Sequence, residues 1–516
     1  MRAPRTGLEW FTLKNRSFSA QVLAGLLLAT ATLGLSACGN KIYYYPQYNY
    51  AGRPIPPSGL LQRVMAAYTS GGLSGGLEIL DGLRDIRSNV QNTIPAFQIN
   101  GYSAADPVTI INYPEQTTGY VLSYTDGVLG KVNYSTEAGS GSVASFGGTT
   151  PSAAASIDGT TFAGAAEQAG ILVLSSGGSS FAMNLPNVDK VVINQGNSVV
   201  LAMVRNSNTL YRVVKLPATN NPVTPPGAVD CEPLLLPVFC VVPVAGTYDR
   251  PTDVKFSLDG TTAYVLNSGP EDGGTTASVT FLQQGALNIN SIPTVNPLSP
   301  AAPSPMETLP VANPVPIPGG VTAAVADGTY LYLSGQRLQA SGLFAGNLTL
   351  LNLSTYAVSA PISISDGTHT KMLLADDNTL WIGASQCASG VRAALAATGN
   401  TTQAANTNCL TMVTLNGTTT PTAQIIPAVS ATATNPVTVP YPNTNQNLYY
   451  YGSLTGLCWV QNYHKVYTAY GGQIHAFTTN TTSLGPAGSE INNANITIQG
   501  TVLDVAYIDA ETNSAD

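Results

Sequence analysis

Short stretches of alternating apolar and polar residues, each followed by a tight turn and a second apolar run, recur along the chain from Arg63 onward. In the clearest copy, the alternating stretch 253–258 leads through Asp259-Gly260 into the apolar run 263–266. A period of two is typical of a β-strand, and Asp-Gly supplies the positive-φ turn that joins two twisted antiparallel strands. The pattern therefore predicts β-hairpins repeated over most of the chain.

Eight apolar runs occupy the place of the second strand in successive units. They are Arg63–Thr69, Gly119–Thr125, Thr161–Ala165, Val199–Val204, Ala263–Asn267, Tyr330–Ser334, Leu380–Gly383 and Lys465–Tyr470. The later units carry long insertions, which are Pro-rich around residues 222–226 and 293–318 and rich in Ala, Thr and Asn around 393–408. Loops of that length in a compact domain are usually functional or flexible.

The unit around Asp253 resembles the YVTN-type β-propeller repeat, which reads Val-x-Phe-Ser-x-Asp-Gly followed by a Tyr-Val strand that ends in Asn. Here Val254, Phe256, Ser257 and Asp259-Gly260 match, and Tyr264-Val265-Leu266-Asn267 departs at its third position only. The resemblance implies an all-β fold, a β-propeller over residues 61–509. We predict eight blades from the count, or seven if the short unit at 152–186 is not a blade. Two stacked β-sandwich domains are the alternative.

The two ends of the repeat region predict how the ring closes. The first unit, beginning at Arg63, lacks a leading strand, whereas the apolar stretch 501–508 at the other end has no partner within its own unit. We expect this last strand to become the innermost strand of the first blade. A ring closed in this way removes exposed sheet edges, which invite aggregation.

The N-terminal segment predicts export and a lipid anchor. An uncharged stretch from Ala20 to Leu35 follows a basic start, and Leu35-Ser36-Ala37-Cys38 resembles the cleavage site of a bacterial lipoprotein signal peptide. The resemblance implies cleavage before Cys38 and lipid attachment to its thiol, while an ordinary secretory leader is the alternative. Residues 38–60 are rich in Tyr and Pro and predict a tether, and residues 510–516 a short tail. By analogy, Gly39 after the cysteine favours the outer membrane.

The remaining five cysteines fall into two close pairs and one single residue. Cys231 and Cys240, and likewise Cys387 and Cys409, predict local disulfides in an oxidising compartment. Cys458 lies in an apolar strand and predicts a buried thiol. A metal site is the alternative, but the close Cys/His spacing of such sites is missing from the sequence.

Charge is scarce, since only 9% of the residues are charged. The formal charge is −8, and the leader carries four cations and one anion, so the chain from Cys38 onward would carry −11. An acidic balance of this kind argues against nucleic acid and anionic lipid as ligands.

Candidate chemistry in the sequence is sparse. The three histidines, His369, His464 and His475, read as polar residues of turns and strands rather than as metal ligands or acid–base groups. The acidic turns at 271–272 and 376–377 could chelate Ca²⁺, but solvated hairpin turns explain them better. Glu115, Arg212 and Asp253 are the residues that could place charge in an axial channel.

No catalytic residue, metal ligand or cofactor is assigned from these patterns. We expect an exported, lipid-anchored, monomeric propeller that acts as a binding or scaffolding module for protein or glycan in the cell envelope, through long loops on a rigid ring. The alternative is a propeller hydrolase, lactonase or lyase with its site in the axial channel. Charged side chains that converge in the channel would favour the enzyme, and a lining of Ser, Thr and aliphatic groups would favour binding alone.

Overall fold

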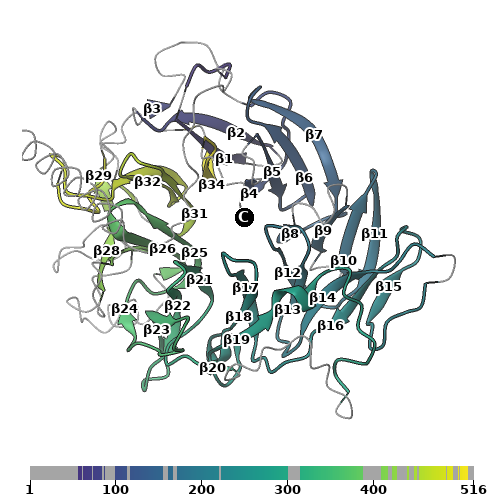
Figure 1. The fold of residues 1–516 in the computed structure, drawn as a ribbon. Helices are drawn as coiled ribbons and strands as arrows, with labels where there is room; N and C mark the ends of the chain where they lie inside the picture. The colour runs from purple at the N-terminus through teal and green to yellow at the C-terminus, as the bar shows by residue number, and fades with distance from the viewer. Residues whose placement is uncertain are drawn as a thin grey trace, which may run out of the picture.

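The chain folds into eight small antiparallel sheets set as blades around a central axis (Figure 1). The structure is a computed structural model that describes residues 56–60, 62–71, 74–83, 86–87, 99–112, 117–154, 161–166, 171–219, 222–299, 314–387, 408–415, 421–426, 438–440, 447–449, 452–483, 485–491, 498 and 500–509. Within these residues, the predicted all-β propeller with eight blades is confirmed. The leader, Cys38 and most of the expected tether lie outside them.

The first four blades, each given from its innermost to its outermost strand, come from the N-terminal half and the last strand of the chain. They are blade 1 with β34 (Thr501–Tyr507), β1 (Arg63–Gly71), β2 (Ser74–Asp81) and β3 (Ile86–Arg87); blade 2 with β4 (Pro107–Asn112), β5 (Thr118–Ser123), β6 (Val128–Asn133) and β7 (Ala138–Ser145); blade 3 with β8 (Ser152–Ala154), β9 (Thr161–Ala166), β10 (Ile171–Ser176) and β11 (Ser179–Asn184); and blade 4 with β12 (Val188–Ile193), β13 (Val200–Val204), β14 (Leu210–Lys215), β16 (Phe239–Pro243) and β15 (Asp230–Glu232).

The other four blades follow in chain order. They are blade 5 with β17 (Pro251–Phe256), β18 (Thr262–Asn267), β19 (Ser278–Gln283) and β20 (Val315–Pro316); blade 6 with β21 (Ala323–Ala326), β22 (Tyr330–Leu338), β23 (Phe344–Asn352) and β24 (Ile362–Ser363); blade 7 with β25 (Thr368–Ala375), β26 (Thr379–Ser385), β27 (Leu410–Thr414) and β28 (Thr422–Ile426); and blade 8 with β31 (Leu454–Val460), β32 (Lys465–Tyr470) and β33 (Gln473–Thr478). A further two-stranded sheet joins β29 (Thr438–Pro440) to β30 (Asn447–Tyr449). Helix within the described residues is limited to three short 3-10 turns, η2 (Gly269–Asp272), η3 (Gln284–Leu287) and η4 (Asp376–Asn378).

All eight runs predicted as second strands occupy that position. They correspond to β1, β5, β9, β13, β18, β22, β26 and β32. The short unit at 152–186 forms blade 3 with four strands of its own, so the seven-blade alternative is wrong. The arrangement of two stacked sandwiches is wrong for the same reason, because the sheets follow one another around a ring (Figure 1).

The last strand closes the ring, as the sequence predicted. β34 pairs antiparallel with β1, with Val64 opposite Tyr507 and Thr69 opposite Thr501. The buried Arg63 side chain stabilises the closure, because its guanidinium lies 2.7 Å from the Asp509 carboxylate and 2.8 Å from that of Glu137 on blade 2. Both ends of the propeller are thereby joined to the neighbouring blade.

The core is divided among the interfaces between neighbouring blades, and eight hydrophobic clusters occupy these eight interfaces. β1 shows why its sequence reads as a continuous apolar run. Val64 and Ala66 pack toward blade 8, whereas Met65 and Ala67 pack toward blade 2. Because successive side chains of a strand point to opposite faces, a strand packed between two blades needs apolar residues at every position.

Among the described residues, none of the helical segments is long and apolar enough to cross a bilayer.

Candidate functional site

A β-bulge near the start of the innermost strand recurs from blade to blade. Six of the eight strands carry the bulge near their start. The residues after it are Asp504 on β34, Thr109 on β4, Lys190 on β12, Asp253 on β17, Lys371 on β25 and Gly456 on β31. Four of these six residues are charged in a chain with 9% charged residues. Bulges are common beside functional sites because they redirect a side chain.

The charges on blades 4 and 5 form one group around Asp253. Its carboxylate lies 2.9 Å from Lys190 Nζ and 3.0 Å from Lys255 Nζ. Burial acts to raise the pKa of Asp253, but the two lysine charges outweigh it and lower this pKa to about 2. The carboxylate therefore stays ionised at neutral pH and is a poor proton donor there.

The charges on blades 7 and 1 form a second group across blade 8. Lys371 Nζ lies 3.2 Å from Asp504 Oδ1, and Asp504 Oδ2 accepts a 2.9 Å hydrogen bond from the Ile110 N–H. Gly456 on the intervening blade allows this approach, because a Cβ there would lie 2.8 Å from the Asp504 carboxylate. Burial raises the pKa of Asp504, and Lys371 only partly offsets this effect.

A cavity of about 380 Å³ adjoins the second group, and we call it the axial cavity. Four consecutive innermost strands, β25, β31, β34 and β4, contribute to its wall. The residues that line it are Ile110, Asn112, Lys371, Leu373, Leu374, Leu457, Cys458, Trp459, Gln461, Asp504, Val505, Ala506 and Tyr507. This wall mixes charged, amide, aromatic and aliphatic groups, which is the usual composition of a small-molecule site.

Cys458 is the free cysteine that the sequence predicted, and it is buried beside this cavity. Burial raises the pKa of its thiol, and the nearby Asp504 charge raises it further. Since the thiolate is the reactive form, Cys458 is a poor nucleophile at neutral pH.

Of the three residues expected to place charge in the channel, Asp253 lies on an innermost strand, β17, and pairs with Lys190 of β12, and Glu115 lies outside the described residues. Arg212 does not, because it lies on the third strand of blade 4, where its guanidinium donates to the Ser291 carbonyl at 2.7 Å. The sequence analysis missed Lys371 and Asp504. The sequence feature that could have identified them is a charged residue shortly after the start of a predicted innermost strand, in a chain that is otherwise poor in charge.

The three histidines lie in separate surroundings. His369 Nε2 is 2.9 Å from the Ser365 carbonyl, and His475 Nδ1 is 2.6 Å from Glu490. His464 Nδ1 is 2.7 Å from Asp377. Within the described part of the chain, no three His, Cys, Asp or Glu side chains are grouped as metal ligands would be.

The acidic turns considered for Ca²⁺ use their carboxylates within the protein. Glu271 accepts hydrogen bonds from the Gln336 backbone N–H at 2.7 Å and from its side-chain amide at 3.2 Å. Burial raises the pKa of Glu271 to about 7. Asp376 accepts a 2.9 Å hydrogen bond from the His464 N–H, so this turn joins blade 7 to blade 8.

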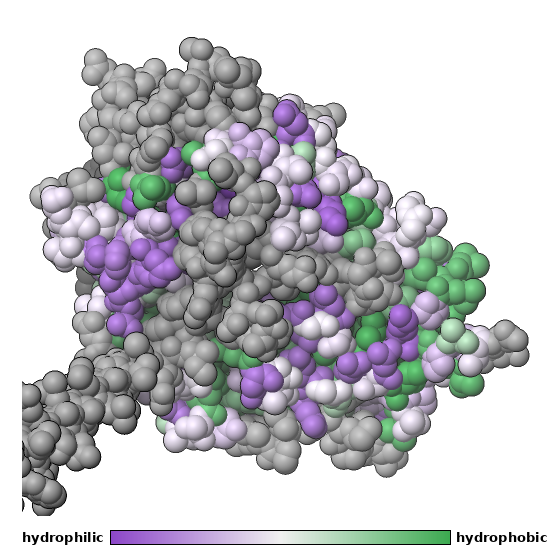
Figure 2. All heavy atoms as spheres, turned by 45° about the horizontal axis from the view of Figure 1, so that its top comes forward, coloured by the Kyte–Doolittle hydropathy of each residue, from purple (hydrophilic) through white to green (hydrophobic). Residues whose placement is uncertain are grey.

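The first predicted disulfide, Cys231–Cys240, is confirmed and holds an extra outer strand on blade 4. We call residues 222–238, which connect β14 to β16 and include β15, the blade 4 loop. Leu234 and Leu236 in this loop are 79% and 77% exposed, and Val223 and Val229 of the same loop are also exposed. In Figure 2, hydrophobic residues gather at the right, the side on which Figure 1 places the outer strands of blades 3 and 4.

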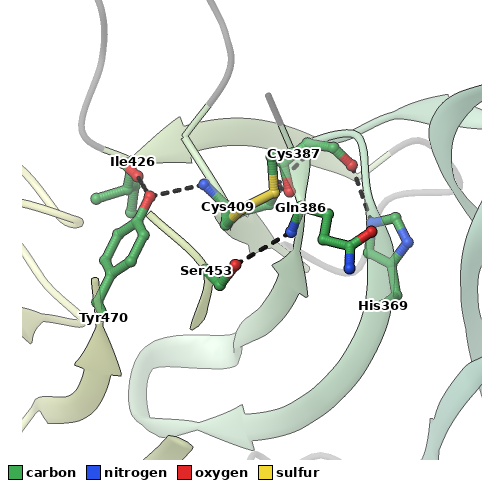
Figure 3. The surroundings of a disulfide bond; sticks show 9 residues. His369, Gln386, Cys387, Cys409, Ile426, Ser453 and Tyr470 are labelled. Atoms are coloured by element: carbon green, nitrogen blue, oxygen red, sulfur yellow. Dashed lines mark hydrogen bonds between the residues drawn. A yellow bond between two sulfur atoms is a disulfide. The ribbon is translucent and has the colours of Figure 1, made fainter. Parts of the chain in front are cut away.

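The second predicted disulfide, Cys387–Cys409, is also confirmed and joins the end of β26 to the start of β27 (Figure 3). Tyr470 of blade 8 fixes this corner, because its hydroxyl accepts a 2.7 Å hydrogen bond from the Cys409 N–H and donates to the Ile426 carbonyl. The disulfide closes the base of an insertion that lies outside the described residues, and the Tyr470 hydroxyl joins this corner of blade 7 to blade 8.

No protein-family model matches the chain, and no curated protein matches it. Among solved structures, a putative 6-phosphogluconolactonase from Bacteroides fragilis aligns with 89% of this chain and 99% of its own at 10% identity, with a TM-score of 0.41. The Pseudomonas aeruginosa periplasmic gluconolactonase PpgL aligns with 86% of this chain and 98% of its own at 11% identity, with a TM-score of 0.41. The dihydro-heme d1 dehydrogenase NirN aligns with 87% of this chain and 80% of its own at 12% identity, with a TM-score of 0.47. Likeness at this level concerns the fold alone.

Proposed function

We propose that this chain is an exported, lipid-anchored β-propeller of the cell envelope that acts as a binding module, with a protein partner docked on the blade 4 loop. The leader and Cys38 support export and anchoring. Both disulfides support an oxidising compartment, where such bonds persist.

The observation that carries the binding role is the exposure of the blade 4 loop. Its four exposed side chains, Val223, Val229, Leu234 and Leu236, are among nine large hydrophobic residues exposed in the described part of the chain. Exposed apolar side chains gathered on one loop are typical of an interaction site.

The loop is also held in place before any partner binds. Cys231 pairs with Cys240 both through the sheet and through the disulfide, and Cys240 belongs to a small buried cluster with Val214 and Val242. A preorganised apolar surface loses little conformational entropy on binding, which favours affinity.

A protein fits this surface better than an anionic bilayer does. Asp230 and Glu232 precede the exposed leucines in the loop, and the exported chain would carry −11 overall. Negatively charged lipid headgroups would repel both the loop and the whole molecule.

The docking proposal is tested by photo-cross-linking in native envelopes from a reactive residue at the exposed position 233 of the loop. We expect a discrete protein adduct that disappears in Leu234→Glu/Leu236→Glu and persists in the control Leu338→Glu, since Leu338 is exposed on blade 6. The substitutions are on exposed side chains, so the melting temperature should stay unchanged. Identical adducts in all three proteins, or binding of the wild type to protein-free vesicles, would contradict the proposal.

The anchor is tested separately. Cys38→Ser should move the protein from the membrane fraction to the soluble fraction, and unchanged membrane association would refute lipid attachment to this thiol.

A second candidate, a hydrolase or lactonase acting in the channel, is favoured by the meeting of Asp504 and Lys371 at the axial cavity. Loss of a general acid or base costs about 10²–10⁴-fold in rate. Turnover of a δ-lactone that falls by this factor in Asp504→Asn would establish the enzyme, and equal rates with and without wild-type protein would exclude it for that substrate.

A further inference from the structure

The outermost strand of blade 3, β11, has an edge that can accept a further strand. β11 contains no charged residue and no proline, and Ser180, Ala182 and Asn184 on it are exposed. The Asn184 N–H points away from β10, because it donates a 2.7 Å hydrogen bond to the Asp230 carboxylate. Since the backbone groups of an antiparallel strand alternate in direction, those of Ser180 and Ala182 also point away from β10. The outer edge of β11 therefore presents backbone donors and acceptors to solvent.

Most other outermost strands in the described part of the chain are short or covered. β3, β20 and β24 have two residues each. The segment 488–491 covers the edge of β33, because the Ile491 N–H donates to the Ala476 carbonyl at 2.8 Å. Part of β7 is covered as well, since the Gly139 N–H donates to the Asn100 carbonyl at 2.7 Å. Natural sheets protect their edges in these ways, so an open, uncharged edge of six residues indicates a place for another strand.

One face of β11 is continuous with the blade 4 loop, and Figure 1 shows β11 beside β15 of that loop. Phe181 and Met183 of β11 pack into the hydrophobic cluster between blades 3 and 4. Leu235 of the loop is buried in the same cluster, while its neighbours Leu234 and Leu236 are exposed. Because alternate side chains of a strand share a face, every second side chain of a strand added to β11 would lie on the side of these exposed leucines.

The surface formed by β11 and the blade 4 loop is acidic. Residues 179–184 and 222–238 include two acidic residues, Asp230 and Glu232, and no Lys or Arg. Asp230 lies at one end of the open edge, where it accepts the Asn184 N–H. Complementary charge steers association and disfavours wrong partners. A segment that carries Lys or Arg therefore fits this surface better than an acidic one.

We propose that the protein partner binds by adding an extended segment, in which apolar and polar residues alternate, as a further strand on the free edge of β11. Its backbone pairs with Ser180 and Ala182, and its apolar side chains pack against Leu234 and Leu236. A Lys or Arg of the segment lies beside Asp230. Binding of this kind takes its affinity from main-chain hydrogen bonds and its specificity from the contacts of alternate side chains. This mode of binding rests on the docking at the blade 4 loop proposed above and adds the form of the partner's contact.

Strand addition is tested by amide hydrogen exchange of the complex that is cross-linked from position 233 in native envelopes. The purified adduct and the free protein are compared by mass spectrometry. We expect exchange at residues 179–184 to be slower by about tenfold or more in the adduct, because paired backbone groups are protected. One continuous segment of the partner should be protected together with them. The turn 339–343 between β22 and β23 on blade 6 serves as the internal control and should exchange equally in both samples.

The matched variants are Ala182→Pro and Ala182→Val. Proline removes the outward N–H and is tolerated on an edge strand where the N–H faces solvent, so the ladder with β10 should remain. Valine keeps the N–H and is favourable in a strand. We expect Ala182→Pro to lower the yield of the adduct from position 233 by about tenfold, and Ala182→Val to leave it unchanged. The exchange measurement uses the natural residue at 182, so it does not depend on the folding of either variant.

Strand addition and docking on the loop fail in different ways. An adduct without slower exchange at residues 179–184, or equal adduct yields from Ala182→Pro and Ala182→Val, would overturn strand addition and leave docking on the blade 4 loop standing. Slower exchange at 179–184 without a protected continuous segment of the partner would also overturn it, because a folded surface would then cover β11. The absence of any adduct from position 233 would overturn both proposals.

Discussion

The two charged groups, around Asp253 and around Asp504, both follow a β-bulge of an innermost strand and behave in opposite ways. Asp253 lies between two lysines, and its pKa is lowered to about 2. Asp504 has one lysine, and burial raises its pKa. Both carboxylates are buried, so the number of nearby cations decides the sign of the shift.

The difference also separates their effects on stability. Asp253 has a lower pKa in the folded than in the unfolded chain, so it stabilises the fold above pH 3.8, and this contribution is lost as the pH falls toward 2. Asp504 has a raised folded pKa, so its ionised form lowers stability above that pKa, and acidification relieves the cost. The first group stabilises the ring, while the second adjoins the axial cavity and lowers stability.

The largest effect is expected from Lys371→Met, which leaves Asp504 buried without its cation. Breaking one side of a buried ion pair costs about 3–5 kcal/mol, and the partial exposure of Lys371 places this case near the lower end. Urea unfolding at pH 7 measures the loss. Lys371→Met/Asp504→Asn should recover most of it, and a double variant as unstable as the single one would contradict the pairing.

Asp253→Asn should lower the free energy of unfolding by about 2 kcal/mol at pH 7, from the difference between the unfolded pKa of 3.8 and a folded value of about 2. The difference in the free energy of unfolding between Asp253→Asn and the wild type should shrink by roughly half at pH 3. Paired urea titrations at the two pH values measure it. A gap that is constant with pH would mean that the carboxylate charge is not the cause.

Lys255→Met should cost less than about 1 kcal/mol, because Lys190 still compensates Asp253 and both lysines are partly exposed. Lys190→Met/Lys255→Met should lose more stability than the two single variants lose together, because the double variant leaves Asp253 buried without a nearby cation. Asp504 is left in the same situation by Lys371→Met. Additive losses in a double-mutant cycle would show that the two lysines act independently.

The smallest effect is expected from Asp504→Asn, with a free energy of unfolding at pH 7 equal to or slightly above that of the wild type. Asn keeps an acceptor for the Ile110 N–H, and the partly exposed Lys371 can be solvated. Thermal unfolding at pH 7 compares this variant with Asp253→Asn. A loss of stability as large as that of Asp253→Asn would mean that the ionised carboxylates of Asp504 and Asp253 contribute equally to stability.

The fold was largely predictable because its signals are local. A second strand such as Ala263–Asn267 is packed between two blades, so its apolar run and preceding Asp-Gly turn are visible in the sequence alone. The unpaired stretch at 501–508 predicted its pairing with β1 for an equally simple reason, since one end lacked a strand and the other had one too many. The disulfides followed from close spacing in sequence.

The candidate site was less predictable because it joins residues far apart in the chain. Asp253 was named from its strand, but Lys371 and Asp504 are 133 residues apart and meet across blade 8, where Gly456 leaves room for Asp504. Arg212 was misplaced for a related reason, since the sequence does not show whether a charged strand residue faces the channel or a neighbouring loop. The exposure of Leu234 and Leu236 likewise depends on where β15 is held.

By itself, the amino-acid sequence determined the strand pattern, the number of repeats, the closing strand and the cysteine pairs of this protein, because each of these depends on neighbours in the chain or on a count along it. Only the tertiary structure decided which charges pair across blades, which strand edge stays open and which apolar side chains remain exposed. These properties depend on the distance between blades and on the number of opposite charges within reach, and both are set by the closure of the ring.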